Sequence, residues 1–120
     1  TSGTPWLPVN ENYRTLNAAA EEKDTDSVLH FYRHLAKLRE TIPALLDGVY
    51  EELLEENEQI YAFSRTLEKT CIKTAVNFST KDAALPAGFL RGTRLAGSYA
   101  DAPTTSLRPL EAVIYEEEIQ

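Results

Sequence analysis

The chain has 120 residues, of which 42% are hydrophobic and 26% charged, and its formal net charge is −7 at pH 7. This length is enough for one domain with a hydrophobic core, and the composition is that of an ordinary globular protein. The acidic balance argues against nucleic acid or an anionic membrane as a partner, because phosphate groups would be repelled. No apolar run approaches the roughly 20 residues that a membrane helix needs.

The start of the chain and its cysteine content bear on where the protein works. Residues 1–6 have neither the basic nor the apolar region of a signal peptide. The chain contains no methionine, so we expect it to be a piece of a longer polypeptide. Cys71 is its single cysteine and cannot form an internal disulfide. These features favour a cytoplasmic location.

Residues 1–24 predict an irregular segment, because proline, glycine and asparagine interrupt any regular period. Large apolar side chains nevertheless occur here: Trp6, Leu7, Val9, Tyr13 and Leu16. A loop of this length without secondary structure is uncommon inside a compact domain, and it is usually functional or packed on a neighbour.

Residues 26–41 predict an amphipathic helix. Asp26 and Ser27 can cap its N-terminus. Apolar side chains recur at spacings of three and four residues and form one stripe: Val28, Phe31, Tyr32, Leu35, Leu38 and Ile42. Pro43 ends the helix, because it lacks an amide proton and disfavours the helical conformation of the preceding residue.

The remainder of the chain predicts antiparallel β-strands. We expect them over residues 48–54, 59–66, 70–78, 95–99 and 110–116. Residues 67–69 would join the second and third strands as a β-hairpin. The last strand has apolar side chains on both faces, so we expect it in the centre of the sheet.

Alternation divides the side chains of the hairpin between two faces. Tyr61 and Phe63 share one face of the second strand, whereas Ile60 and Ala62 share the other. Large aromatic side chains contribute most to burial, and we therefore assign the aromatic residues of these strands mostly to the core: Tyr61, Phe63, Phe78 and Tyr115.

The sequence offers few signals for metal or covalent chemistry. His30 and His34 have a spacing that can share a zinc ion, but they lie away from the apolar stripe without a third ligand, so we expect no metal. The acidic run 51–58 fits no calcium loop and predicts a solvated turn. Cys71 predicts a buried, inert thiol. The triplet at Asn77 matches a glycosylation acceptor, which a cytoplasmic location disfavours. No cofactor is expected.

Several segments resemble a known family. Residues 5–13 read Pro-Trp-Leu-Pro-Val-Asn-Glu-Asn-Tyr. They closely resemble a segment of the α-glucosidase branch of the α-amylase superfamily (glycoside hydrolase family 13), in which Glu11 is commonly proline. Similar stretches follow in the family's order, at residues 26–28, 38–39, 59–65, 77–79 and 107–112. The resemblance runs from about residue 4 to the end and is nearest to the oligo-1,6-glucosidases.

The resemblance implies an architecture. In this family a catalytic (β/α)₈ barrel is followed by an antiparallel β-sandwich. Residues 1–45 would be the last loop and last helix of the barrel, and residues 46–120 the C-terminal sandwich. No motif here matches the family's three catalytic carboxylates, so no catalytic residue is carried over.

The resemblance also implies a function for the fragment. It would be a non-catalytic part that stabilises the barrel of an enzyme acting on α-1,6- or α-1,4-linked glucose oligosaccharides, and the missing barrel would be its partner. The acidic residues lie in solvated runs without the apolar surroundings that raise a carboxyl pKa, so the 120-residue chain alone should not hydrolyse anything. The alternative is a carbohydrate-binding β-sandwich module without hydrolase activity.

Two aromatic side chains of the first segment are candidates for substrate binding. Trp6 and Tyr13 could stack on sugar at the rim of a barrel, but we favour a structural role in anchoring the loop. The helix stripe has a related consequence. Without its barrel, the chain should dimerise through this stripe, pack the helix on its own sheet, or leave residues 1–45 disordered.

Overall fold

The structure, a computed structural model, describes residues 2–120. The described chain divides into two compact units, of which the first ends at Lys37 and the second spans Leu38–Gln120. The boundary falls inside helix α2 (Val28–Thr41), so this helix contributes residues to both units. The division into residues 1–45 and 46–120 refers to a parent enzyme and stays a prediction.

The first unit is less irregular than its composition predicts. A 3₁₀ turn, η1 (Glu11–Arg14), and a short helix, α1 (Ala18–Glu21), lie within residues 1–24. Asn10 and Asn17, which count as breakers in the sequence, are the N-caps of these two elements. Each side-chain oxygen accepts a hydrogen bond from a backbone amide of the turn that it begins.

Helix α2 confirms the predicted helix and begins two residues later than expected. Ser27 Oγ accepts a hydrogen bond from the amide of His30 at 3.3 Å. The carboxylate of Glu21 accepts another from the amide of Leu29 at 3.0 Å. An acidic group at this end also suits the positive end of the helix dipole.

Pro43 ends α2 and at the same time begins a further helix, α3 (Ala44–Asp47), which the sequence patterns did not predict. Proline suits the first turn of a helix, where its missing amide proton costs nothing. Gly48 follows α3, and a Cβ there would lie 2.3 Å from the carbonyl oxygen of Ala44. The chain can therefore turn tightly from α3 into the first strand only because this residue has no side chain.

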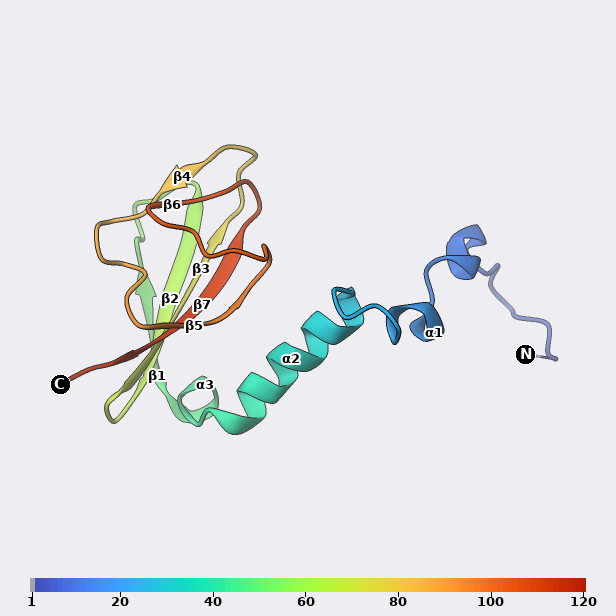
Figure 1. Cartoon of the computed structure of the whole chain (residues 1–120), viewed down its shortest axis with the longest axis horizontal. Coiled ribbons are helices and arrows are strands. Elements are labelled where there is room, and N and C mark those ends of the chain that lie inside the picture. Colours follow the sequence, from blue (N-terminus) through green and yellow to red (C-terminus); the bar gives the residue numbers. More distant parts are fainter. Residues whose placement is uncertain (1) are drawn as a thin grey trace. The chain divides into compact units, whose positions relative to one another are not determined.

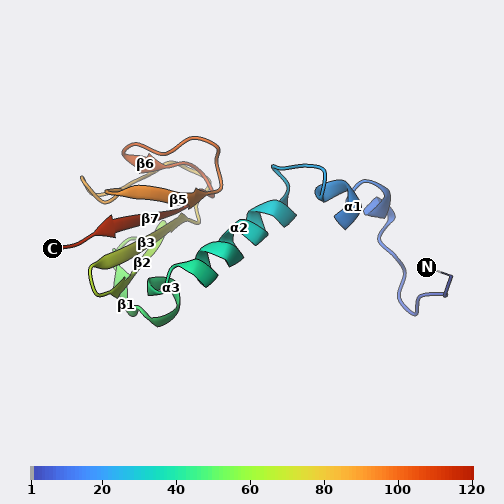
Figure 2. The same cartoon turned by 60° about the horizontal axis from the view of Figure 1, so that its bottom comes forward.

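Within residues 2–120, five strands form one antiparallel sheet. They are β1 (Val49–Leu53), β2 (Ile60–Leu67), β3 (Thr70–Asn77), β5 (Thr93–Gly97) and β7 (Ala112–Glu118). Their order is β1-β2-β3-β7-β5, which can be followed in Figure 2. The expected antiparallel β-structure is confirmed, as is the central position of the last strand.

Two strands start two residues away from the predicted position, β5 earlier and β7 later, and backbone conformation explains both shifts. Gly92 has a φ of +91°, and a Cβ there would lie 2.0 Å from Glu116 O, so β5 can begin to pair with β7 directly afterwards. Leu110 has a φ of +56° and belongs to a turn in which the amide of Glu111 donates to Arg108 O at 3.1 Å. Pairing in β7 therefore begins only after this turn.

The hairpin of β2 and β3 has a two-residue turn instead of the predicted three-residue connection. Leu67 pairs with Thr70, which leaves Glu68 and Lys69 at the tip. Glu68 has a φ of +53°, a conformation that favours glycine in such turns.

The strands β1 to β7 and their connections, residues 49–118, are called the β-domain, and its second layer is small. Strands β4 (Ala83–Ala84) and β6 (Ser106–Leu107) form a two-stranded ladder, which Figure 1 shows at the end of the sheet away from α3. Together with the loops around it, this ladder covers one face of the five-stranded sheet. The core contains these buried residues: Ile60, Ala62, Ala75, Ala83, Leu107, Val113 and Tyr115.

The core lies on the face of β2 that carries its smaller side chains. Ile60 and Ala62 are buried, whereas Tyr61 is 41% exposed and Phe78 is 69% exposed. Phe63 is half-buried on the same face as Tyr61 and is not part of the core cluster.

The assignment of Tyr61, Phe63 and Phe78 to the core was therefore wrong, and that of Tyr115 is confirmed. The physical reason is that period-two alternation defines two faces but does not say which one is covered. The small side chains that β2 and β3 place on the covered face, Ala62 and Ala75, leave room for the second layer to pack at interior density.

Candidate functional site

The uncovered side of the sheet carries four aromatic residues, which we call the aromatic face: Tyr50, Tyr61, Phe63 and Phe78. The ring of Phe63 lies 5.5 Å from that of Tyr50 and 5.7 Å from that of Tyr61, measured between centroids. These tilted contacts are of the kind that aromatic pairs prefer. Tyr50 is 47% exposed, so the cluster is ordered by its own contacts and yet open to a partner.

The two tyrosines of the aromatic face are joined by a hydrogen bond of 3.0 Å between their hydroxyl groups. This bond raises the pKa of Tyr50 to about 12, and desolvation and the negative charges of Glu52 and Glu55 act in the same direction. The Tyr50 hydroxyl therefore stays protonated at physiological pH.

Arg65 lies on the same side of the sheet, directly opposite Tyr50 in the strand register. One terminal nitrogen of its guanidinium donates to the carbonyl oxygen of Leu46 in α3 at 3.0 Å. Its Nε is buried and has no hydrogen-bond partner. The Nε of Arg94 is in the same state, and a buried donor without a partner costs free energy.

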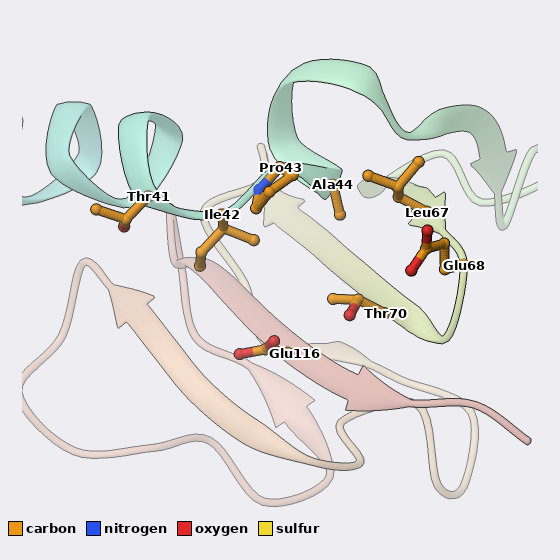
Figure 3. Close-up of a pocket in the computed structure, with 8 residues that line it drawn as sticks. All are labelled: Thr41, Ile42, Pro43, Ala44, Leu67, Glu68, Thr70 and Glu116. Carbon is orange, nitrogen blue, oxygen red and sulfur yellow. The ribbon is translucent and has the colours of Figure 1, made fainter.

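One end of this side is covered by α3. Ala44 and Ile72 are each 1% exposed. Beside them is a hollow of about 220 Å³ lined by Thr41, Ile42, Pro43, Ala44, Leu67, Glu68, Thr70 and Glu116. Figure 3 shows that its two carboxylates come from separate places, Glu68 from the hairpin turn and Glu116 from β7. Glu68 is exposed, so the hollow is not a closed cleft around two acids.

A second hollow, of about 150 Å³, lies at the other end of β2. Tyr61 and Phe78 line it together with polar side chains of the connection between β1 and β2, including Glu55 and Gln59. The acidic run 51–58 was predicted as a solvated turn: its first residues belong to β1, its later residues form the turn beside this hollow, and its glutamates are exposed.

The covered side of the sheet carries a network around Arg108. Its guanidinium donates to both carboxylate oxygens of Glu111, at 2.6 and 2.9 Å, and to Asp101 Oδ1 at 2.8 Å. It also lies 4.0 Å from the centroid of the Tyr99 ring. Glu111 is fully buried.

The electrostatics of this network keep its carboxylates ionised. Burial alone would raise the pKa of Glu111, but the hydrogen bonds and charge of Arg108 outweigh it and the pKa is lowered. The hydrogen bond from Arg108 likewise lowers the pKa of Asp101. A glycosidase general acid needs the opposite shift, so these two carboxylates fit a structural role.

Asn77 connects the same loops by hydrogen bonds. Its fully buried amide nitrogen donates to the carbonyl oxygens of Lys81, Leu107 and Arg108, at 2.7 to 3.1 Å. Its carbonyl oxygen accepts from the amide and hydroxyl of Ser79. The Asn77 side chain cannot be glycosylated in this folded state, because the acceptor nitrogen is enclosed and fully used.

Trp6 and Tyr13, the predicted sugar-stacking candidates, both lie in the first unit. Trp6 is 93% exposed, and Tyr13 contacts the guanidinium of Arg14. The structure brings neither of them to a hollow described above. Their role in substrate binding or in anchoring the loop stays a prediction.

The predicted metal and thiol candidates have structural surroundings. His30 Nδ1 lies 3.0 Å from Ser27 Oγ and 3.1 Å from the carbonyl oxygen of Glu21, within the capping network of α2. Across the described residues, no three potential metal ligands of the types His, Cys, Asp and Glu gather in one place. Cys71 is a free, buried thiol in β3, as predicted.

Comparison with known proteins connects this architecture to a family. The family model "Alpha amylase, catalytic domain" matches residues 1–48. The oligo-1,6-glucosidase of Heyndrickxia coagulans is 35% identical over 116 residues, which cover 96% of this chain and 21% of that relative. The chain is related to the α-amylase family. The oligo-1,6-glucosidase of Parageobacillus thermoglucosidasius is also 35% identical, over 97% of this chain and 22% of its own length.

Solved structures of α-amylase-family relatives share the fold. A trehalulose synthase matches with a TM-score of 0.85 and 35% identity, covering 98% of this chain and 23% of that one. The trehalose-6-phosphate hydrolase of Bacillus licheniformis matches with a TM-score of 0.83 and 28% identity, covering 97% and 23%. The resemblance inferred from the motifs is thus confirmed. The chain spans about a fifth of the length of the curated relatives it matches.

Two features of the site were missed by sequence reasoning. The pairing of Arg108 with Glu111 belongs to a motif that the resemblance singled out, and its i, i+3 spacing was the signal that could have revealed the ion pair. The aromatic face had no such signal, because burial of one sheet face depends on loops distant in sequence. Among residues 2–120, no helix has the length and apolar character needed to cross a membrane.

Proposed function

We propose that the chain is the non-catalytic C-terminal portion of an α-glucosidase that hydrolyses α-1,6- or α-1,4-linked glucose oligosaccharides. One observation carries this proposal. The match to the catalytic-domain model ends at residue 48, where α3 gives way to β1, whereas the similarity to whole glucosidases continues over 96% of the chain. Residues before this point belong to a catalytic domain, and the β-domain follows it.

The role of the β-domain, in this proposal, is to stabilise the barrel. Its sheet has a finished core on one face and an aromatic, partly exposed surface on the other. Such a surface is typical of a domain that packs against a neighbour. Residues 1–45 then supply the last loop and last helix of the barrel.

The isolated chain should have no hydrolase activity. Retaining glycosidases need two carboxyl groups about 5 Å apart, one of them with a raised pKa. The pKa values of Glu22, Asp101 and Glu111 are lowered instead, in each case by a hydrogen-bonded arginine.

The direct test is an assay of the pure 120-residue chain on p-nitrophenyl α-glucoside and on isomaltose, with the Heyndrickxia coagulans oligo-1,6-glucosidase as positive control. We expect no turnover above the buffer rate. Turnover that co-purifies with the folded chain would overturn the proposal.

A second candidate function, a carbohydrate-binding module, is favoured by one observation. Tyr61 and Phe78 are exposed and line a hollow together with carboxylate and amide side chains. Aromatic faces stack on sugar rings, and such polar groups accept hydrogen bonds from hydroxyls. Titration of the ¹⁵N-labelled chain with maltose and isomaltose distinguishes the two functions. Saturable shifts of the Tyr61 and Phe78 amides, or of the Trp6 indole, would favour the module.

We also place the parent enzyme in the cytoplasm. The support is Cys71, which is a free buried thiol in a chain without a second cysteine.

A further inference from the structure

We propose that Asn17 is a positioning residue for substrate binding: its side chain holds turn η1 so that Tyr13 presents its ring to the oligosaccharide bound by the parent enzyme. This inference rests on the proposed function, because the substrate belongs to the parent. It adds a residue that composition marks only as a helix breaker, and it gives Tyr13 a contact with sugar rather than the anchoring of its loop.

The Asn17 side chain joins two elements of the first unit. Its amide nitrogen donates to the carbonyl oxygen of Tyr13 at 3.0 Å and to that of Arg14 at 3.4 Å. Its amide oxygen accepts from the backbone amide of Ala20 at 2.9 Å. The last carbonyl groups of a helical turn have no partners within that turn. One side chain therefore ends η1, begins α1 and fixes the path of the chain between them.

Further hydrogen bonds tie α1 to α2. Ser27 Oγ donates to the carbonyl oxygen of Glu21 at 2.9 Å, and the carboxylate of Glu21 accepts from the amide of Leu29. The guanidinium of Arg33 donates to both carboxylate oxygens of Glu22, at 2.6 and 2.8 Å. Hydrogen bonds thus link η1 through α1 to the N-terminal turns of α2.

Burial contributes little to this arrangement. Within residues 2–37, Ser27 is the one buried residue, and it lies outside η1 and α1. A loop that keeps its shape by polar caps does not need its large apolar side chains for folding. Those side chains remain available for contact with another molecule.

The surroundings of Tyr13 favour a polar ligand. The residue is 50% exposed, Arg14 Nε donates to its hydroxyl at 3.3 Å, and the guanidinium lies 5.7 Å from the ring centroid. Burying this pair under an apolar barrel surface would take a charge out of water without a counter-ion, which is costly. A sugar ring can stack on the aromatic face and accept hydrogen bonds from the guanidinium, so it suits the pair better.

The place of the loop in the chain points to the same contact. The catalytic-domain model matches residues 1–48, and residues 2–27 directly precede helix α2. In a (β/α)₈ barrel the segment before each helix is a βα loop, and active sites are built from these loops. In the proposed parent enzyme, Tyr13 therefore belongs to the face of the barrel that holds the substrate.

The experiment uses a chimaera in which this whole chain replaces the matched segment of the Heyndrickxia coagulans oligo-1,6-glucosidase. Asn17→Asp keeps the oxygen that caps α1 and removes the amide that holds η1. Asn10→Asp is the matched control. Asn10 caps η1, and among residues 2–120 its side chain serves only as an acceptor, from the amide of Asn12. Both substitutions add the same charge at the start of a helical turn, but only Asn17→Asp removes a donor.

We expect Asn17→Asp to raise the KM for isomaltose by about five-fold and to leave kcat within about two-fold, because it weakens binding without changing the chemical step. Asn10→Asp should leave the KM within about two-fold. Tyr13→Ala should raise the KM at least as much as Asn17→Asp. The double variant should be no worse than Tyr13→Ala alone, because Asn17 acts through Tyr13. The melting temperature of Asn17→Asp should change by less than about 2 °C, which separates positioning from a loss of stability.

A second measurement needs no chimaera. In the isolated ¹⁵N-labelled chain, the side-chain amide protons of Asn17 should exchange with solvent more slowly than those of Asn12, because they are hydrogen-bonded to η1. Equal exchange rates would show that Asn17 does not hold the turn and would overturn the inference.

Other outcomes in an active chimaera would also contradict the inference: an unchanged KM in Asn17→Asp or in Tyr13→Ala, equal rises in Asn17→Asp and Asn10→Asp, or additive effects in the double variant. These outcomes leave the proposed function intact. A folded chimaera without α-glucosidase activity contradicts the proposed function instead, and the inference is then wrong as well, because Tyr13 has no substrate to contact. If the chimaera fails to fold, the exchange comparison in the isolated chain decides.

Discussion

The two faces of the five-stranded sheet differ in which side chains of β2 they bury, and the buried face is not the one with the larger side chains. Along β2 the smaller residues Ile60, Ala62 and Ser64 are buried, and the larger Tyr61 and Phe63 lie on the open side. Elsewhere the covered face also holds a large ring, because Tyr115 of β7 is buried in the same core. The open face keeps large aromatic rings, which can fill a gap between domains. Side-chain size alone therefore does not show which face of the sheet is the core.

Adjacent residues at the end of β3 should show the largest contrast between the faces. Asn77→Ala removes a buried amide that bonds three carbonyl groups, and we expect it to lower the free energy of unfolding by about 3 kcal/mol. Phe78→Ala should change it by less than about 0.5 kcal/mol, because the ring is exposed. Urea denaturation of both variants measures the difference. Similar costs at the two positions would mean that the faces do not differ as described.

Larger side chains placed on the two faces should also change the free energy of unfolding unequally, by less than the contrast between Asn77→Ala and Phe78→Ala. Ala75→Leu inserts a large side chain under the β4–β6 ladder and should cost about 2 kcal/mol. Val76→Leu, on the open side of the same strand, should cost less than about 0.5 kcal/mol, because nothing fixed lies above it. Denaturant midpoints compare the two. A tolerated Ala75→Leu would show that the second layer is loosely packed.

The carboxylates of the covered face should make the free energy of unfolding depend on pH. The folded-state pKa values of Glu111 and Asp101 are lowered from ordinary values of 4.5 and 3.8, so between the folded and unfolded pKa values the unfolded chain binds more protons. The stabilisation is present above about pH 4.5 and is lost as the pH falls through the folded values. Unfolding measured from pH 3 to 7 should show this fall, with a shallower slope in Glu111→Gln. An unchanged slope would exclude Glu111 as its source.

The open face should lower the stability of the folded chain at alkaline pH. This is the smallest of the effects that we expect. Because the pKa of Tyr50 is raised to about 12, its stabilising contribution is complete below about pH 10, where the unfolded tyrosine is also neutral. It is lost as the pH rises from about 10 through 12. Tyr61→Phe removes the hydroxyl partner and should bring the pKa of Tyr50 back toward its usual range, as measured by absorbance of the ionised phenol. Tyr99→Phe is the control and should leave this titration unchanged.

The candidate site could be predicted from the sequence only in part. Residues 107–112 were singled out as a motif shared with the family, and the structure shows that this motif contains the ion pair of Arg108 with the buried Glu111. Trp6 and Tyr13 were chosen for their chemistry, but neither lines the hollows of the β-domain. Arg65 gave no signal, because an arginine within a strand is usually a solvated residue and its unpaired Nε is visible only in three dimensions.

The sequence by itself determined the helix α2, the hairpin of β2 and β3, the central position of β7 and the relation to the α-amylase family. These follow from local periodicity and from motifs, which are properties of neighbouring residues. Only the tertiary structure decided which face of the sheet is covered, where Pro43 begins a second helix, and which arginine Nε atoms are buried without a hydrogen-bond partner. Those features depend on contacts between residues far apart in the chain, and no local pattern encodes the loop that closes one face and leaves the other open.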